Sequence, residues 1–298
     1  MATTSFSDEI VKNKRSSLLL AIVVSLILFF LVYFIILFLI PELVIIALPL
    51  SAFLILIYTY SSYRFGDSVV LSATNAKPAE AREYQYLRDT IEGLSIASGI
   101  PPPKVYVIDS EDLNAFATGR NPENASIAVT TGLINSLNRQ ELEGVISHEI
   151  SHIKNRDILF MTLIAVLVGL AAIVSHLILR SLWFGARRDR RDKSGIMILL
   201  LIVGIILAII APIVVRLVQF AISRKREYLA DASGASLTRY PEGLASALEK
   251  IAKKNQGRIK VSEAVSHLFF VDPRQTSLDS LFATHPPIQE RIKRLRNM

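Results

Sequence analysis

Two histidines one helical turn apart form the strongest chemical signal in this 298-residue chain. His148 and His152 belong to the stretch His-Glu-Ile-Ser-His, and side chains four residues apart on a helix can bind one metal ion. Glu149 is rotated by about 100° from His148, beside such an ion, where a carboxylate can accept a proton from activated water. This arrangement is typical of zinc peptidases.

The residues around this stretch predict a helix. Asn138 followed three residues later by Glu141 has the form of a capping box. The apolar residues that follow recur at helical spacing, at Leu142, Val145, Ile146, Ile150 and Ile153. A five-residue match also arises by chance in roughly one chain of this length in a hundred, so two exposed surface histidines are the alternative for the motif taken alone.

A catalytic zinc usually has three protein ligands, so a third ligand must come from elsewhere in the chain. Glu227 and Asp231 are four residues apart and share one face of a predicted helix. We expect Glu227 to be the third ligand and Asp231 to accept a hydrogen bond from a ligating imidazole. Solvated surface acids are the alternative. The ligand interpretation is favoured because the histidine pair and the segment with Glu227 each adjoin a predicted membrane span. Both would therefore meet at the membrane surface.

The composition limits the class of protein and of metal site. Hydrophobic residues make up 51% of the chain, which is high for a soluble domain. Cysteine is absent, which excludes disulfides, thiolate ligands and a cysteine nucleophile. The net charge is +7, and the basic residues crowd beside apolar runs, so a lipid bilayer is the expected partner rather than nucleic acid.

Four apolar runs predict membrane-spanning helices. They lie at about 18–40, 43–60, 158–179 and 196–215. They divide the chain into four regions. Residues 1–60 form a tail and a membrane hairpin, 61–157 the first part of a peptidase domain, 158–218 a second hairpin, and 219–298 the second part of the peptidase domain. His176, inside the third run, is interpreted as a residue of helix packing.

Flanking basic residues predict that the peptidase domain faces the cytoplasm. The loop at 180–194 would then face outward despite its six basic residues. Incomplete crossing by the third and fourth runs is the alternative. The chain order places the histidine pair just before the third run, so the active site is expected at the membrane surface.

The predicted fold is α+β, a mainly helical zinc-peptidase domain with a small β-sheet plus four transmembrane helices. A helix is expected over 78–98 and strands over 105–108 and 127–130. The residues between the strands, 114–119, predict an edge strand. Such a strand either binds an extended substrate backbone or is an ordinary hairpin strand.

Four separated motifs resemble the HtpX-type membrane zinc metalloproteases, relatives of the CAAX prenyl proteases. The first is the His-Glu-Ile-Ser-His stretch with Asn155 and Asp157, and the second is Glu-Tyr-Leu-Ala-Asp at 227–231. The third is Asn-Ala-Phe-Ala at the edge strand, and the fourth is Thr-His-Pro at 284–286 with Arg291 six residues after the histidine. The resemblance covers nearly the whole chain.

The resemblance implies one zinc ion per subunit and substrate binding along the edge strand, at Asn114, Ala115, Phe116 and Ala117. It implies that His285 and Arg291 stabilise the oxyanion, a role that suits their chemistry. A helix-entry residue beside two prolines is the alternative for His285. Asn155 is expected to support the ligands by orienting the turn where the helix meets the membrane.

The resemblance further implies a multi-pass enzyme of the plasma membrane that degrades misfolded or surplus membrane proteins, a stress-response activity, with its catalytic domain in the cytoplasm. Three other functions are considered. Four predicted spans argue against a site-specific prenyl-protein protease, which would carry more spans, and an intramembrane protease would need the metal pair inside a span rather than before one. A non-catalytic zinc-binding scaffold is the third. The sequence makes no prediction of the oligomeric state.

Overall fold

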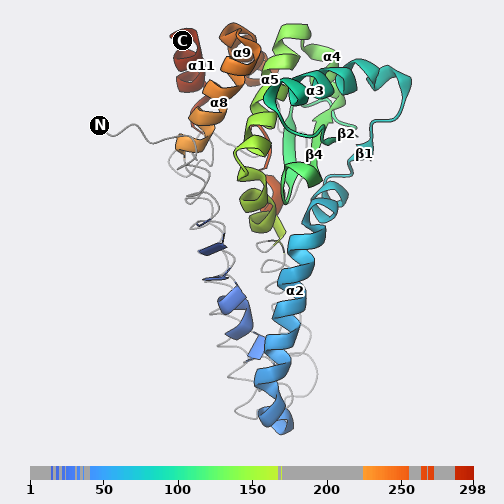
Figure 1. Cartoon of the computed structure of the whole chain (residues 1–298), viewed down its shortest axis with the longest axis vertical. Helices are drawn as coiled ribbons and strands as arrows, with labels where there is room; N and C mark the ends of the chain where they lie inside the picture. The colour runs from blue at the N-terminus through green and yellow to red at the C-terminus, as the bar shows by residue number, and fades with distance from the viewer. Residues whose placement is uncertain are drawn as a thin grey trace, which may run out of the picture.

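The computed structural model describes residues 41–166, 224–254, 263–266, 268–271 and 286–298, with residue 169 and scattered positions between 15 and 40. A long helix, α2 (Val44–Ala73), extends away from a compact body in which helices surround a small sheet (Figure 1). The predicted mainly helical domain with a small sheet is confirmed for this part of the chain.

The sheet has four strands in the order β1-β2-β4-β3. Their bounds are β1 Lys77–Pro78, β2 Lys104–Ile108, β3 Ala115–Gly119 and β4 Ala125–Thr130. β2 and β4 are parallel, whereas the other two pairs are antiparallel. The three predicted strands are confirmed, and β3 lies at the edge of the sheet as predicted.

The helix predicted over 78–98 begins later than expected. Pro78 pairs with Tyr106, and the Ala79 N–H donates to the Val105 carbonyl, which holds this segment extended beside β2. A short 3₁₀ turn follows at Arg82–Tyr84, and α3 spans only Gln85–Ser98. The predicted start was therefore wrong, because strand pairing overrode the helical pattern.

Helix α5 (Arg139–Lys154) is the centre of the body and carries the histidine pair. Both hydrogen bonds of the predicted capping box form, from the Asn138 side chain to the Glu141 N–H and back from Glu141 to the Asn138 N–H. The helices around it are α4 Thr131–Ser136, α8 Arg224–Thr238, α9 Pro241–Lys254, α10 Glu263–Ser266 and α11 Ile288–Arg296. Helix α5 packs directly on α3, α8, α9 and β3.

The two faces of the sheet belong to two apolar cores. One core joins strand residues such as Ala117 and Ile127 to α3, α5, α9 and α11. The other joins Phe116 and Ala128 to the end of α2, to the helix Asp157–Val166 and to residues near 268–269. Alternate residues of one strand thus face different cores, as the strand period requires.

Helix α2 is the one helix in the described part of the chain that is long and apolar enough to cross a membrane. Many of its apolar side chains are exposed, Ile45 by 87% and Leu56 by 70%. The helix was predicted to end at Tyr60 but continues to Ala73, because its last turns pack on the helix Asp157–Val166. Of the other predicted spans, 196–215 lies outside the described residues and the rest are described only in part.

Helices α5 and α9 approach closely at Gly144. A Cβ atom there would lie 2.7 Å from the backbone nitrogen of Leu244. We expect Gly144→Ala to destabilise the folded protein by about 1–3 kcal/mol, because backbone must move to make room. Thermal unfolding in detergent measures this effect. Gly93→Ala is the matched control on α3, where nothing lies within 4 Å, and its melting temperature is expected to be unchanged or raised.

Candidate metal centre

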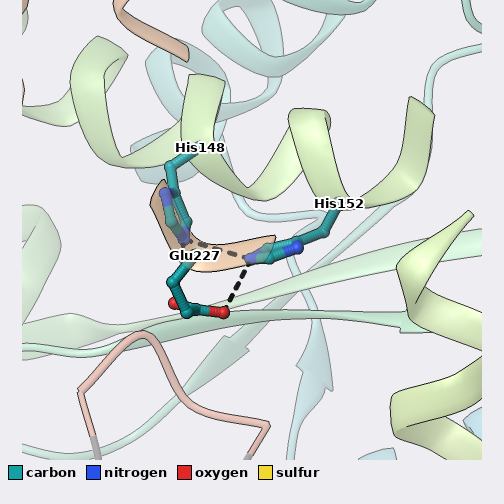
Figure 2. A group of neighbouring side chains, drawn as sticks. All are labelled: His148, His152 and Glu227. Carbon is teal, nitrogen blue, oxygen red and sulfur yellow. Dashed lines mark hydrogen bonds and ion pairs between the residues drawn. The ribbon is translucent and has the colours of Figure 1, made fainter. Parts of the chain in front are cut away.

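Helix α8 brings a carboxylate to the histidine pair because small residues let it lie close to α5. A Cβ atom at Gly234 would be 3.0 Å from the backbone nitrogen of His148. Glu227, almost two turns earlier on α8, consequently faces both imidazoles (Figure 2). One ligand atom from each of His148, His152 and Glu227 lies within 4.8 Å of the others, and all three side chains are buried.

The geometry of these atoms suits a tetrahedral zinc ion. The two Nε2 atoms are 3.1 Å apart, and the Glu227 oxygens are 3.8 Å from His148 Nε2 and 3.5 Å from His152 Nε2. Ligands at about 2.0–2.1 Å from a tetrahedral ion would be roughly 3.3 Å apart. Two imidazole nitrogens and one carboxylate also form a known set of catalytic zinc ligands, which leaves one position open. The residues present therefore fit zinc.

The far nitrogen of each imidazole is held by a carboxylate. His148 Nδ1 lies 2.9 Å from Asp231 Oδ1, and His152 Nδ1 lies 3.1 Å from Asp157 Oδ2. A hydrogen bond at Nδ1 fixes the ring and leaves Nε2 with a lone pair directed at the metal position. Asp231 lies where the sequence predicted it.

Asp157 is a supporting residue that the sequence analysis missed as a partner of His152. It follows the end of α5, where Arg156 has a φ of 59° and turns the chain back toward the helix. A carboxylate five residues after the second histidine was the available signal, but the turn that aims it at His152 was not predictable from spacing.

The two imidazoles have opposite pKa shifts. Burial lowers the pKa of His148 to about 4, and the partial compensation from Asp231 does not reverse the effect. Burial also opposes the charged form of His152, but the Asp157 hydrogen bond and the charges of Glu227, Asp157 and Glu149 outweigh it and raise the pKa to about 9. The carboxylates around His152 thus create a site that favours positive charge.

Arg291 lies on the Nδ1 side of His148, next to Asp231. Its Nε and Nη2 donate to the two carboxylate oxygens of Asp231 at 2.9 and 2.7 Å, and its Nη1 donates to the Phe270 carbonyl at 3.3 Å. Burial raises the pKa of Asp231, but the Arg291 charge and the His148 hydrogen bond reverse this and lower the pKa to about 2. The predicted oxyanion contact does not match this placement, because the guanidinium lies on the Nδ1 side of His148 and is held by Asp231.

The remaining predicted residues have different outcomes. Glu149 is buried on α5, near enough that its charge raises the pKa of His152. Asn155 is the buried residue that caps the end of α5, where its predicted role in orienting the turn stays a prediction, and no hydrogen-bond partner of its side-chain amide is found among the described residues. His285 lies outside the described residues.

The predicted substrate strand is β3. Phe270 and Val271 of the same chain form hydrogen bonds with the residues at its start, Asn114 and Ala115. The Asn114 side chain donates to the Val271 carbonyl at 2.6 Å and accepts from the Val271 N–H at 3.1 Å. The Ala115 carbonyl accepts from the Phe270 N–H at 2.8 Å. Of the other two predicted residues, Phe116 packs its ring edge-to-face against the Phe269 ring, and Ala117 is buried beside it in the strand.

We expect Asp157→Asn to weaken zinc binding by about 10–100-fold, because the amide no longer fixes His152 as a carboxylate does. A competition assay with a fluorescent zinc chelator measures the dissociation constant. Asp109→Asn, at a position away from the centre, is the control. Unchanged zinc affinity in Asp157→Asn would contradict the supporting role.

The chain is similar to a set of known proteins. The sequence pattern of Peptidase family M48 matches residues 81–298. A "Protease HtpX homolog" of Thermoanaerobacter pseudethanolicus is 49% identical over 253 residues, which are 84% of each chain. A protein of the same description from Dictyoglomus thermophilum is 43% identical over 298 residues, 100% of this chain and 96% of that one. The crystal structure of S. mikatae Ste24p has a similar fold, with a TM-score of 0.51 and 23% identity over 82% of this chain and 57% of that chain.

Proposed function

Because this chain belongs to peptidase family M48, we propose that it is a membrane-anchored zinc endopeptidase that cleaves misfolded or surplus membrane proteins. One observation carries the proposal, the convergence of His148, His152 and Glu227 on one buried point beside Glu149. A non-catalytic scaffold requires zinc ligands, but zinc binding alone does not require a further buried carboxylate beside them. The adjacent Glu149 therefore favours an enzyme.

The residues of the centre have separate roles in this proposal. A zinc ion held by the three ligands supplies Lewis-acid activation of water and of the scissile carbonyl. Glu149 accepts a proton from the attacking water and delivers it to the leaving amine. Asp157 and Asp231 keep the two imidazoles oriented, and Arg291 holds Asp231 in place. One centre thus positions water, substrate carbonyl and proton carrier together.

The proposed membrane location is supported by the packing of the apolar helices. Leu28, Ile55 and Leu163 form a buried cluster, and the Tyr58 hydroxyl donates to the Val166 carbonyl at 3.0 Å. Segments from three of the four predicted spans are thus in contact. We propose that four spans cross the plasma membrane. The metal centre would then lie at the membrane surface on the cytoplasmic side.

Protease assays test the proposed substrate class. Detergent-purified protein is expected to cleave casein, an unfolded polypeptide, at several bonds, and a zinc chelator is expected to stop the cleavage. A prenylated peptide cut at a single bond, with casein untouched, would favour the site-specific prenyl-protein protease instead. Zinc binding without cleavage of either substrate would favour the scaffold.

The absence of cysteine allows a clean test of orientation. Glu92 is exposed on α3, so Glu92→Cys introduces one reactive thiol into the peptidase domain. A membrane-impermeant maleimide is expected to label it only after the cells are opened. Labelling of intact cells would place the domain outside the cytoplasm.

A further inference from the structure

Two adjacent phenylalanines that follow α10 have different surroundings. Both are almost completely buried, Phe269 at 0% and Phe270 at 2% exposed. The Phe269 ring packs edge-to-face against the Phe116 ring, with centroids 5.0 Å apart, in the core on one face of the sheet. The Phe270 ring belongs to the other core and lies against the imidazole of His148, with centroids 4.9 Å apart and planes at 83°. Of the two rings, that of Phe270 is therefore the one placed at the metal centre.

The backbone around Phe270 is held by the start of β3. The Phe270 N–H donates to the Ala115 carbonyl at 2.8 Å. The side-chain amide of Asn114 donates to the Val271 carbonyl at 2.6 Å and accepts from the Val271 N–H at 3.1 Å. We call these last two hydrogen bonds the Asn114 clamp. Together the three bonds fix the chain on both sides of the Phe270 side chain, so β3 sets the direction in which the ring points.

One hydrogen bond does not fully orient the His148 imidazole. Asp231 accepts from Nδ1 at 2.9 Å, which fixes one atom of the ring. The ring can still tilt about that bond, because the outer torsion of a histidine side chain has a broad energy minimum. Edge-to-face contacts between aromatic rings are directional, so the nearly perpendicular Phe270 ring restricts this tilt. The direction of the Nε2 lone pair is restricted with it.

The same ring also covers the Arg291 guanidinium. The Cζ atom of Arg291 lies 4.6 Å from the centre of the Phe270 ring, and its Nη1 donates to the Phe270 carbonyl at 3.3 Å. Arg291 pairs with Asp231, and both side chains are buried. The attraction between two charges is stronger where water is excluded. The Phe270 ring thus protects the ion pair that holds Asp231, the hydrogen-bond partner of His148.

We infer that Phe270 is a positioning residue of the metal centre, which sets the tilt of the His148 imidazole by packing against it and against Arg291. Asn114 supports it, because the Asn114 clamp holds Phe270 in place. This inference rests on the zinc centre of the proposed function. It gives a role in zinc binding to two residues that contribute no ligand atom.

The zinc affinity of two matched variants tests the inference. Phe270→Leu removes the ring but keeps an apolar side chain, and it is expected to weaken zinc binding by about 10-fold or more, the range for residues that orient a ligating imidazole. Phe269→Leu makes the same change at the adjacent residue and is expected to keep the affinity within about twofold, because it orients no ligand. Competition with a fluorescent zinc chelator, on the full-length protein in detergent, gives both dissociation constants.

Cobalt in place of zinc separates positioning from stability. Both substitutions leave a cavity in a core, so both are expected to lower the melting temperature. The visible absorption of bound Co²⁺ depends instead on the geometry of its ligands. The cobalt spectrum is expected to change in Phe270→Leu and to match the wild-type spectrum in Phe269→Leu.

Asn114→Ala tests whether the Asn114 clamp acts through Phe270. The variant is expected to weaken zinc binding by about 3–10-fold, because the released ring no longer restrains His148. Combined with Phe270→Leu it is expected to cause no further loss, since residues that act through one contact are not additive. Asn114→Ala keeps both rings, so its zinc affinity and cobalt spectrum provide the test if Phe270→Leu does not fold.

Four outcomes would overturn the inference. Wild-type zinc affinity in Phe270→Leu would show that the ring does not position His148. Equal loss of affinity in both phenylalanine variants would show that zinc binding follows the stability of the fold. An unchanged cobalt spectrum in Phe270→Leu would exclude a change in ligand geometry, and multiplied losses in the double variant would show that Asn114 acts independently. A wild-type protein that binds no zinc would overturn the proposed function, and the inference with it.

Discussion

Replacing Glu149 with glutamine is expected to reduce kcat/KM for peptide cleavage by about 10²–10⁴-fold, the range that a general base contributes. The amide cannot accept the proton of the attacking water. The side chain is buried next to His148 without being one of the three residues proposed as ligands, so zinc content is expected to stay at one ion per chain. Activity and metal content are measured on the same purified sample.

Glu143→Gln is the matched control for this result. Glu143 lies on the same helix, α5, but forms a surface ion pair with Arg139 at 2.8 Å. It is expected to keep wild-type activity, since exposed pairs contribute little. Near wild-type turnover in Glu149→Gln would contradict the assignment of the base, whereas loss of zinc in that variant would indicate that Glu149 supports the metal instead.

Removing the proposed third ligand is expected to have the other large effect. Glu227→Ala leaves His148 and His152 without the carboxylate that faces both Nε2 atoms. We expect zinc to be lost on dialysis and kcat/KM to fall by about 10³-fold or more, because the metal supplies the activation of water. Metal analysis by mass spectrometry and casein cleavage measure the two effects.

Two comparisons make the Glu227 result specific. Glu92→Gln, at an exposed position of α3, is expected to retain both zinc and activity. Glu227→Asp keeps the charge on a shorter side chain and is expected to bind zinc more weakly than the wild-type protein but better than Glu227→Ala. Full zinc retention in Glu227→Ala would remove Glu227 from the ligand set.

The sequence predicted best those features that depend on local spacing. Three features follow from helical spacing. They are the capping box at Asn138, the burial of the apolar face of α5, and the position of Glu227 and Asp231 on the same helix. The resemblance to HtpX-type proteases is likewise confirmed by the match to family M48 and by relatives of that name. Local patterns and family motifs together were sufficient to identify the three residues that converge.

Features that depend on tertiary contacts were not predictable in the same way. The pairing of Pro78 with β2 has no local signal, so this residue was assigned to a helix instead. The last turns of α2 pack on a helix that is distant in sequence, so the sequence did not predict that α2 continues beyond Tyr60. Arg291 was assigned to the oxyanion from the family resemblance, and a guanidinium suits that role as well as it suits an ion pair with a carboxylate. Only the structure places it against Asp231.

A zinc titration tests the central claim most directly. The wild-type protein is stripped of metal, shown to be folded, and returned to casein with increasing zinc. The account predicts that cleavage is lost on stripping and returns in proportion to zinc until one ion is bound per chain, while Glu149→Gln binds the same amount and stays inactive. Undiminished cleavage by the stripped protein, or full activity in zinc-loaded Glu149→Gln, would contradict it.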